Sequence, residues 1–140
     1  MIATSAKQVR NDWSAVVDSV IREKPKFIKR TRDYMLLADL NTITQLLEPY
    51  SFTAEEYIED DGSVTLSLDQ IDLVENGENR KDAVEKMSSA VLEYAEDFYK
   101  EFAYWARGDR KAHIPFVLKA LVLGDANEIG GLIQCRHGES

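Results

Sequence analysis

The sequence has few cysteine and histidine residues, which in small proteins form the disulfides and metal sites that stabilise a fold with a small core. It contains one cysteine, Cys135, and two histidines in 140 residues. A single cysteine excludes an internal disulfide framework and indicates a reducing compartment. A chain of this length hides roughly two-thirds of the surface that its unfolded form exposes, so it can fold without disulfides or a structural metal.

Long apolar runs are also absent. Residues 1–10 lack the apolar stretch of a signal peptide. The longest apolar window, residues 112–124, is too short to span a bilayer and contains Lys119. We therefore expect a cytoplasmic protein that makes no membrane contact.

Residues for a catalytic or metal centre are scarce. Cys135 and His137 are close in sequence, but His113 is the only other imidazole. A metal site would be short of ligands, and a Cys-His nucleophile would have no orienting group. The carboxylates from Glu55 to Asp61 lack the alternating spacing of a calcium loop, so we interpret them as a solvated hairpin end. We predict no metal, no cofactor and no catalysis.

The charges are distributed unevenly along the chain. The whole sequence carries 25 acidic and 17 basic residues, and this acidic average argues against nucleic acid as a partner. Residues 1–50, however, hold eight basic and six acidic residues, whereas residues 51–140 hold nine and nineteen. The shift indicates two parts with two roles. Five basic residues of the first part fall within nine positions: Lys24, Lys26, Lys29, Arg30 and Arg32.

The first part contains a helix with one apolar face. Ser5 and Gln8 have the spacing of a capping box, so the helix begins there, after a short strand at residues 2–4, and Pro25 prevents its continuation. Fifty residues are too few to bury such a stripe well, so we expect a second copy to cover it in a homodimer. The stripe consists of Val9, Trp13, Val16, Val17, Val20 and Ile21, and we place the dimer interface on the first five.

A basic hairpin follows this helix. Residues 26–29 and 34–38 read as two strands joined by a basic turn. Asp39 is expected to cap a short helix that continues to Glu48. The first module therefore has the order β-α-β-β-α and ends at about Tyr50.

The second part begins with strands. Residues 52–58 and 64–68 are separated by Asp61-Gly62, and the second segment alternates strictly in hydropathy, which predicts a hairpin. Residues 68–74 extend this hairpin or add a third strand. A loop is expected at Asn76-Gly77.

Helices make up most of the remaining chain. Asn79 can cap a long helix whose apolar stripe continues to Trp105 and which Gly108 ends, a length of roughly 40 Å at 1.5 Å per residue. A further helix over residues 110–123 is apolar around nearly its whole circumference and stops at Gly124. The tail beyond it is expected to have a frayed polar end. Most aromatic residues of the long helix are interpreted as core, and two fall off the stripe: Tyr99 and Tyr104.

The first module resembles the Phd/YefM family of bacterial antitoxins. In that family a short strand leads to a helix with the pattern Ser-x-x-x-Ala-Arg-x-Asn/Asp-Leu/Phe-Ser, and the segment from Ser5 to Ser14 reads SAKQVRNDWS. The hydrophobic-x-Arg strand, turn, apolar strand and capped helix of the family match the elements that follow. Val9 stands where the family favours alanine and Trp13 where it favours leucine or phenylalanine. The resemblance covers about the first fifty residues.

This resemblance implies a dimer that binds operator DNA. Family members place basic residues of the helix and hairpin against DNA, and the matching positions are Arg10 and Arg30. Arginine can bind phosphate oxygens or a guanine edge, and a two-fold dimer repeats the patch at the spacing of a pseudopalindrome. The predicted DNA-binding set consists of Lys7, Arg10, Lys29, Arg30 and Arg32.

The second part departs from the family. Phd/YefM antitoxins usually continue with a short disordered segment that folds onto a toxin, but residues 51–140 are too apolar for disorder. Their strands and long helix look loosely like the small domain of HicB antitoxins. As a whole the chain looks like a Phd-like antitoxin subfamily paired with RelE-type ribonuclease toxins. Such toxins are basic because they handle RNA, and an acidic second part is complementary to one.

Three functions are weighed at this point. The favoured one is an antitoxin of a type II system, an α+β protein that acts as a dimeric DNA-binding autorepressor through residues 1–50 and neutralises a basic RelE-like toxin through residues 51–140. The second is a small-molecule-binding or sensing domain without DNA binding, whose pocket lies between the aromatic helix and the helix after Arg110. The third is a nuclease that uses the Glu55–Asp61 carboxylates with magnesium.

Overall fold

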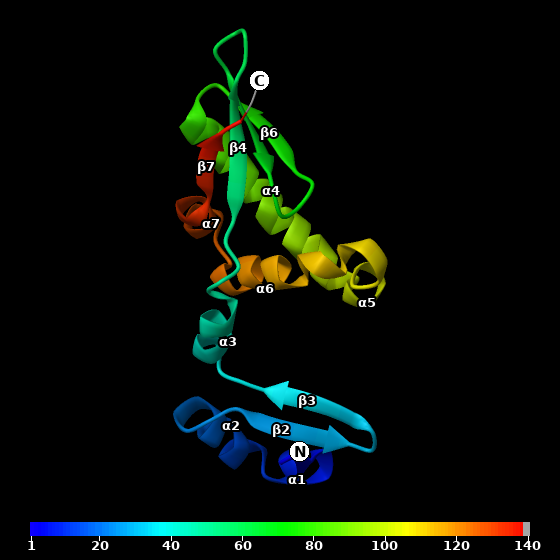
Figure 1. The fold of residues 1–140 in the computed structure, drawn as a ribbon. Coiled ribbons are helices and arrows are strands. Elements are labelled where there is room, and N and C mark those ends of the chain that lie inside the picture. Colours follow the sequence, from blue (N-terminus) through cyan, green and yellow to red (C-terminus); the bar gives the residue numbers. More distant parts are fainter. Residues whose placement is uncertain (139–140) are drawn as a thin grey trace. The chain divides into compact units, whose positions relative to one another are not determined.

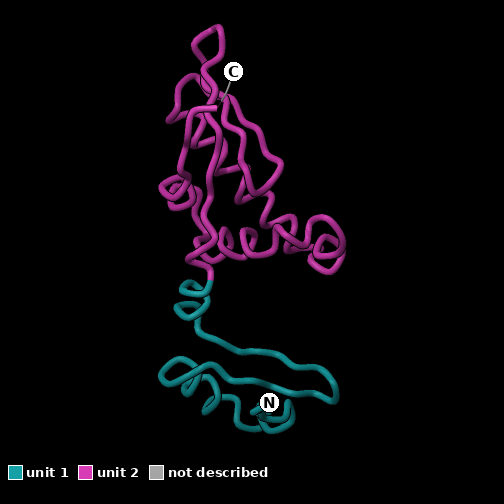
Figure 2. Tube along the Cα trace, viewed as in Figure 1, with its two compact units in different colours: residues 1–46 teal, residues 47–140 magenta. Residues whose placement is uncertain are grey.

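The computed structural model describes residues 1–138 and has an α+β fold (Figure 1). The chain divides into two compact units, residues 1–46 and residues 47–140, here called unit 1 and unit 2 (Figure 2). The division falls between Leu46 and Leu47, at the end of a helix, rather than after Tyr50. No helix in the described part of the chain combines the length and apolar character that a membrane crossing requires.

Unit 1 is a three-stranded sheet with three short helices, of which α1 and α2 pack on the sheet. Its strand order is β1-β2-β3. The central strand β2 is parallel to β1 and antiparallel to β3. The small core lies between α1, α2 and the sheet and consists of Val9, Val16, Val20 and Ile28. The elements are β1 (Thr4–Ser5), α1 (Ala6–Asn11), α2 (Trp13–Arg22), β2 (Lys26–Arg30), β3 (Asp33–Leu37) and α3 (Leu40–Leu47), the last of which reaches the boundary with unit 2.

The predicted first helix is two helices. The Ser5 hydroxyl accepts a hydrogen bond from the Gln8 backbone N–H at 3.2 Å, which confirms the predicted N-cap. The helix then breaks at Asp12, whose backbone (φ −112°, ψ 31°) ends α1 and begins α2. The prediction of one continuous helix was wrong because the apolar spacing continues across the break. The strand expected at residues 2–4 is also displaced, since β1 begins at Thr4.

Unit 2 is a four-stranded sheet with a long helix, α4, across one face. Its strand order is β6-β5-β4-β7, and the last strand of the chain, β7, lies parallel to β4 (Figure 1). The elements are β4 (Thr53–Ile58), β5 (Val64–Leu68), β6 (Val74–Gly77), α4 (Arg80–Lys100), α5 (Phe102–Trp105), the 3₁₀ helix η1 (Gly108–His113), α6 (Ile114–Leu123), α7 (Ala126–Leu132) and β7 (Gln134–His137).

The core of unit 2 follows from the alternation of its strands. Val64, Leu66 and Leu68 of β5 are buried, whereas Thr65 and Ser67 between them face outward. The helix α4 contacts β5 and β6 as well as α6 and α7, so it is the element around which the core is built. Its buried positions are Ala83, Met87, Ser88, Val91, Ala95 and Phe98.

Local signals predicted most of these elements. The hairpin around Gly62 (φ 86°), the Asn79 cap of α4 and the end of α6 at Gly124 (φ 65°) are all confirmed. The predicted loop at Asn76-Gly77 was wrong, because these residues end strand β6. Gly77 is required there for space: a Cβ atom would lie 2.3 Å from the backbone nitrogen of Ala83, where α4 begins.

Two further predictions about unit 2 were wrong. The long helix ends at Lys100 rather than at Gly108, because Glu101 (φ −124°, ψ 45°) leaves the helical conformation. Its 21 residues span roughly 31 Å. The tail is not frayed as far as His137, since it forms α7 and pairs with β4 through β7. The end of the predicted tail, residues 139–140, lies outside the described residues.

Candidate functional site

The basic residues predicted to bind DNA all lie on the surface of unit 1. Ser5 pairs with Lys29, so α1 begins beside the end of the hairpin, while Lys29 and Arg30 are neighbours on one strand and face opposite sides of the sheet. Lys7 and Arg10 belong to α1, Lys29 and Arg30 to β2, and Arg32 to the loop that follows; all five are exposed.

Within the described residues, none of these five side chains takes part in an ion pair. Arg30 stands opposite Asp33 across the hairpin without forming one. The Lys29 ammonium lies 5.4 Å from the centre of the Tyr34 ring, a contact that orients the charge and does not neutralise it. The positive charge of this surface is therefore free to act on a ligand.

A two-residue loop joins the strands at the basic end of the hairpin. Arg30 pairs with Asp33, which leaves Thr31 and Arg32 as the loop. Thr31 has a φ of 56°, and it is the one non-glycine residue with a positive φ in the described part of the chain. A β-branched residue is disfavoured in this region, so the loop stores strain between its two arginine neighbours.

The predicted dimer interface divides into covered and uncovered residues. Val9, Val16 and Val20 are 6–7% exposed because they pack on Ile28 within a single copy. Val17 is half-buried, and Trp13 is 53% exposed. Only the last two still offer apolar surface to a second copy. Sequence periodicity found the stripe but could not show how much of it the chain covers itself.

An apolar hollow lies beside Trp13. Its volume is about 480 Å³, and its floor includes Val9, Ile28 and Met35, with Arg10 in its lining. Met35 is 49% exposed and stands directly opposite Ile28 on β3. Sequence reasoning missed Met35 because its strand carries apolar residues at every position from Tyr34 to Leu37 and so shows no preferred face.

The other face of the sheet is apolar as well. Phe27 pairs with Leu36 and Lys29 with Tyr34, so these four side chains share the face opposite Ile28. Phe27, Tyr34 and Leu36 are 43%, 49% and 46% exposed. Unit 1 thus leaves large apolar side chains uncovered on both faces of a very small sheet, which is typical of a subunit that associates.

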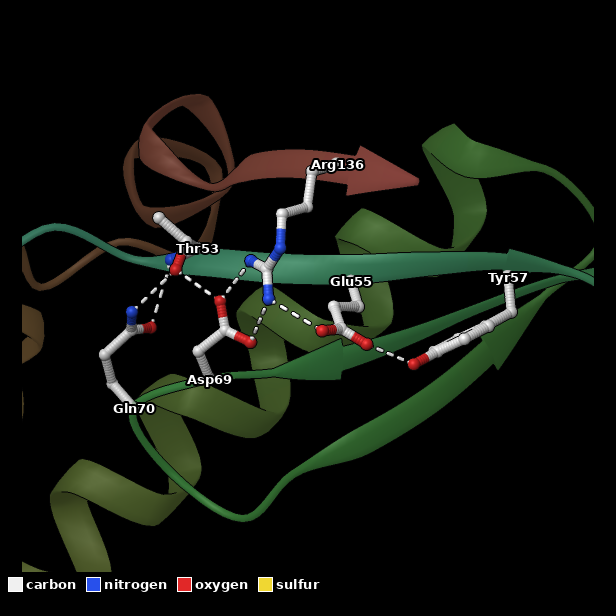
Figure 3. Close-up of polar contacts among 6 residues, drawn as sticks. All are labelled: Thr53, Glu55, Tyr57, Asp69, Gln70 and Arg136. Carbon is white, nitrogen blue, oxygen red and sulfur yellow. Dashed lines mark hydrogen bonds and ion pairs between the residues drawn. The ribbon is translucent and has the colours of Figure 1, made fainter. Parts of the chain in front are cut away.

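In unit 2, polar residues form a network on the sheet face (Figure 3). The Arg136 guanidinium on β7 donates to both oxygens of Asp69 and, at 2.9 Å, to Glu55 on β4. The Tyr57 hydroxyl donates to the other oxygen of Glu55. Gln70 and Thr53 extend the network through two hydrogen bonds of 2.7 and 3.0 Å. These contacts attach the last strand to residues far away in sequence.

The network perturbs its ionisable groups in consistent directions. Hydrogen bonding from Arg136 lowers the pKa of Asp69. Hydrogen bonding from Tyr57, followed by that from Arg136, lowers the pKa of Glu55. The same bond to Glu55 raises the pKa of Tyr57. All groups are held in their ordinary charge states, which suits a structural network better than proton transfer.

A second arginine holds a buried carboxylate at the start of α4. The Glu56 side chain is 3% exposed, and Arg80 donates to its two oxygens at 2.9 and 2.5 Å. These hydrogen bonds lower the pKa of Glu56 against the opposing effect of burial. The pair fixes the first turn of α4 to strand β4.

The carboxylates from Glu55 to Asp61 do not form the single solvated hairpin end that the sequence suggested. Glu55 and Glu56 point to opposite faces of β4 and have separate arginine partners, while Asp61 accepts hydrogen bonds from Ser63 in the loop. Within residues 1–138, no three His, Cys, Asp or Glu side chains converge as metal ligands. The geometry gives no support to magnesium-dependent cleavage.

One hollow of unit 2 lies at the aromatic helix, where a sensing pocket was expected. Its volume is about 210 Å³, and it is lined by Tyr94, Asp97, Phe98, Trp105 and Arg110. The aromatic residues expected outside the stripe, Tyr99 and Tyr104, are exposed. A larger groove of about 720 Å³ lies between α4 and α7, lined by Arg80, Lys81, Val84, Glu85, Ser88, Ser89, Ala126, Asn127 and Gly130.

Two comparisons with known proteins show that the chain is similar to antitoxins. A family model described as PHD-like, antitoxin of RelE/RelB toxin–antitoxin systems, matches residues 1–135. The crystal structure of an antitoxin part of a putative toxin/antitoxin system from Syntrophomonas wolfei subsp. wolfei is similar to this chain, with 33% sequence identity and a TM-score of 0.93. The match covers 99% of this chain and 100% of that one. No curated protein matches the chain.

Proposed function

Because the chain belongs to the PHD-like family of antitoxins of RelE/RelB toxin–antitoxin systems, we propose that it is a dimeric autorepressor with two binding surfaces. Unit 1 binds operator DNA, and unit 2 neutralises a RelE-like ribonuclease toxin by protein binding. Antitoxins are not enzymes and act by binding a cognate toxin. We place the protein in the cytoplasm, because the toxin and the operator are found there.

The observation that carries the DNA proposal is the unpaired positive surface of unit 1. Five exposed basic side chains from α1 and the hairpin lie on a unit that is separate from the acidic bulk of the chain. Neutralising phosphates releases condensed counterions, so affinity should fall steeply as salt rises.

The dimer proposal rests on the uncovered apolar surface of unit 1. We place the two-fold contact at the hollow formed by Trp13, Met35 and the edges of Val9 and Ile28. Arg10 is part of the lining, so a second copy docked here brings the two Arg10 side chains onto one side of the dimer. Two-fold repetition of a small patch is what a pseudopalindromic operator requires.

The toxin proposal rests on the negative charge of the second part and on the fact that this part is folded. Residues 51–140 hold nineteen acidic and nine basic residues, and unit 2 is folded with a core of its own. A ribonuclease that binds RNA presents a basic surface, to which such a protein is complementary. We therefore expect unit 2 to act as a preformed blocker and not as a segment that folds on binding.

The DNA proposal is tested with a fluorescent duplex taken from the region upstream of the protein's own gene. Arg10→Ala and Arg30→Ala should each weaken binding by about 5- to 100-fold and lower the salt slope by roughly one per lost phosphate contact. Arg22→Ala is the matched control, because Arg22 is an exposed arginine at the end of α2 and lies outside the predicted DNA-binding set. Equal affinities for all four proteins would refute a DNA surface on the hairpin.

The toxin proposal is tested by co-expression. The full chain should relieve growth arrest caused by a small basic protein encoded next to its gene, and the two proteins should co-elute at a fixed ratio. A failure to relieve the arrest, with both proteins expressed, would contradict it.

The groove between α4 and α7 supports the small-molecule alternative. Its lining mixes Arg80 and Glu85 with serine and asparagine side chains, so it suits a polar ligand. Metabolites that raise the melting temperature of a protein unable to bind its upstream DNA would favour this alternative over the antitoxin proposal.

A further inference from the structure

The strained residue in unit 1 lies at the centre of its basic end. The described part of the chain has four residues with a positive φ, and three of them are glycines at turns and at a helix end: Gly62, Gly108 and Gly124. Thr31 is the exception, although glycine or asparagine is the usual choice at such a position of a hairpin loop. Among residues 1–138, a non-glycine residue accepts this strain only between Arg30 and Arg32.

The Thr31 side chain makes no contact with another described residue of unit 1 that would offset the strain. Thr31 is exposed, so its side chain gains no stabilisation from packing. Its hydroxyl forms no hydrogen bond with any other described residue, in contrast to Ser5 and Asp39, whose side chains each accept a bond from a nearby backbone N–H. An exposed hydroxyl without a partner, between two unpaired guanidinium groups, has a free donor and a favourable field for an anion.

We propose that Thr31 is a DNA-contacting residue whose hydroxyl donates a hydrogen bond to a backbone phosphate, while its left-handed backbone holds the directions of Arg30 and Arg32. The inference rests on the proposed DNA function of unit 1. Serine and threonine hydroxyls are common phosphate ligands, and such contacts position a protein on DNA without reading its sequence. Thr31 therefore contributes to affinity for every duplex, whereas an arginine at a base edge contributes to specificity.

The test compares Thr31→Ala with Thr31→Ser, because both keep a Cβ atom in the same strained backbone and differ in the hydroxyl. Affinity is measured on the upstream duplex and on a random duplex of equal length. Thr31→Ala should lose about tenfold on both duplexes, the value expected for a lost hydrogen bond to a charged group, and Thr31→Ser should bind within about twofold of the unmodified protein.

Stability is followed in the same proteins through Trp13, with Trp105→Phe as the background so that fluorescence reports unit 1. Thr31→Ala and Thr31→Ser should melt within about 2 °C of one another, since their backbone strain is equal. Thr31→Gly removes both the strain and the hydroxyl, so it should be no less stable and should bind at least as weakly as Thr31→Ala.

The outcomes separate this inference from the proposed function. If the unmodified chain binds the upstream duplex and Thr31→Ala binds equally well, Thr31 makes no DNA contact and the inference falls alone. A Thr31→Ser protein as weak as Thr31→Ala would also overturn it, because the hydroxyl would not be the group in contact. No binding by the unmodified chain to either duplex overturns the inference together with the DNA function.

Discussion

Replacing Arg80 with methionine tests whether the Glu56 carboxylate depends on its one charged partner. Methionine keeps much of the aliphatic stem and removes the guanidinium. The Glu56 side chain is 3% exposed and receives both hydrogen bonds from Arg80, so the substitution leaves a buried carboxylate with no ion-pair partner. Breaking a fully buried ion pair costs about 3–5 kcal/mol, but the Arg80 side chain is 59% exposed and water can reach its place. We expect a loss of about 2 kcal/mol at pH 7.

The sign of the pH dependence is fixed by the Glu56 pKa. In the unmodified protein Arg80 lowers this pKa below its ordinary value of 4.5, so the pair stabilises the fold above that pH and its contribution disappears as the pH falls through the lowered value. Without Arg80, burial is the largest remaining influence and raises the Glu56 pKa, against a smaller lowering by the charge of His137. The variant then regains stability on protonation, so the difference between the two proteins should shrink as the pH falls toward 4.

Urea unfolding of the full chain measures this difference. Trp13→Phe in all proteins leaves Trp105 as the reporter of unit 2. Glu56→Gln and the double variant complete a cycle, in which the double variant should be more stable at pH 7 than Arg80→Met alone, because it has no orphan charge. An Arg80→Met protein within 0.5 kcal/mol of the parent at pH 7 would show that Glu56 is solvated and would refute the argument.

Four further substitutions test the fold of unit 2. Gly77→Ala should lose about 3 kcal/mol or more, because its Cβ would lie 2.3 Å from the first turn of α4, and Gly131→Ala, with no atom within 4 Å, should be neutral or slightly stabilising in the same melts. Asn79→Ala should lose about 1 kcal/mol in urea unfolding through the lost N-cap of α4. Arg136→Met should raise the pKa of Asp69, measured by NMR titration, toward its ordinary value of 3.8, and an unchanged pKa would contradict the role given to Arg136.

Short-range signals in the sequence placed most of the helix and strand ends. Ser5, Asp39 and Asn79 cap helices because each side-chain oxygen accepts a bond from a backbone N–H two or three residues later. Gly62 and Gly124 mark a turn and a helix end because both have positive φ angles. These signals work because their physical cause lies within a few residues of the signal.

Breaks in helices and pairings across the chain could not be predicted in this way. At Asp12 and Glu101 the apolar spacing continues while the backbone turns, so periodicity alone reports one helix where there are two. Strand β7, with the sequence QCRH, is too short and polar to alternate, and its partner β4 lies about eighty residues earlier. Its stability comes from backbone pairing and from Arg136, which are tertiary contacts.

The candidate site could be predicted only in part, because its local features are visible in the sequence and its tertiary contacts are not. The basic residues could be located because a run of like charge is a local feature. The apolar surface beside them could not, since strands β2 and β3 carry apolar side chains on both faces and only the folded unit shows which face α1 and α2 cover. The interface predicted on five stripe residues therefore moves, in our proposal, to Trp13 and to Met35 of the neighbouring strand.

The small core of unit 1 links the two proposals made for it. Four buried side chains in 46 residues make a marginal fold, whereas unit 2 has a core of fourteen buried residues. If a second copy covers Trp13, the folded state of unit 1 depends on protein concentration, and so does the two-fold array of arginines that an operator requires. DNA binds only that array, so operator binding, dimer formation and the folding of unit 1 must stabilise one another by linkage. Repression by this protein would then respond to its concentration more steeply than binding by a stable monomer could.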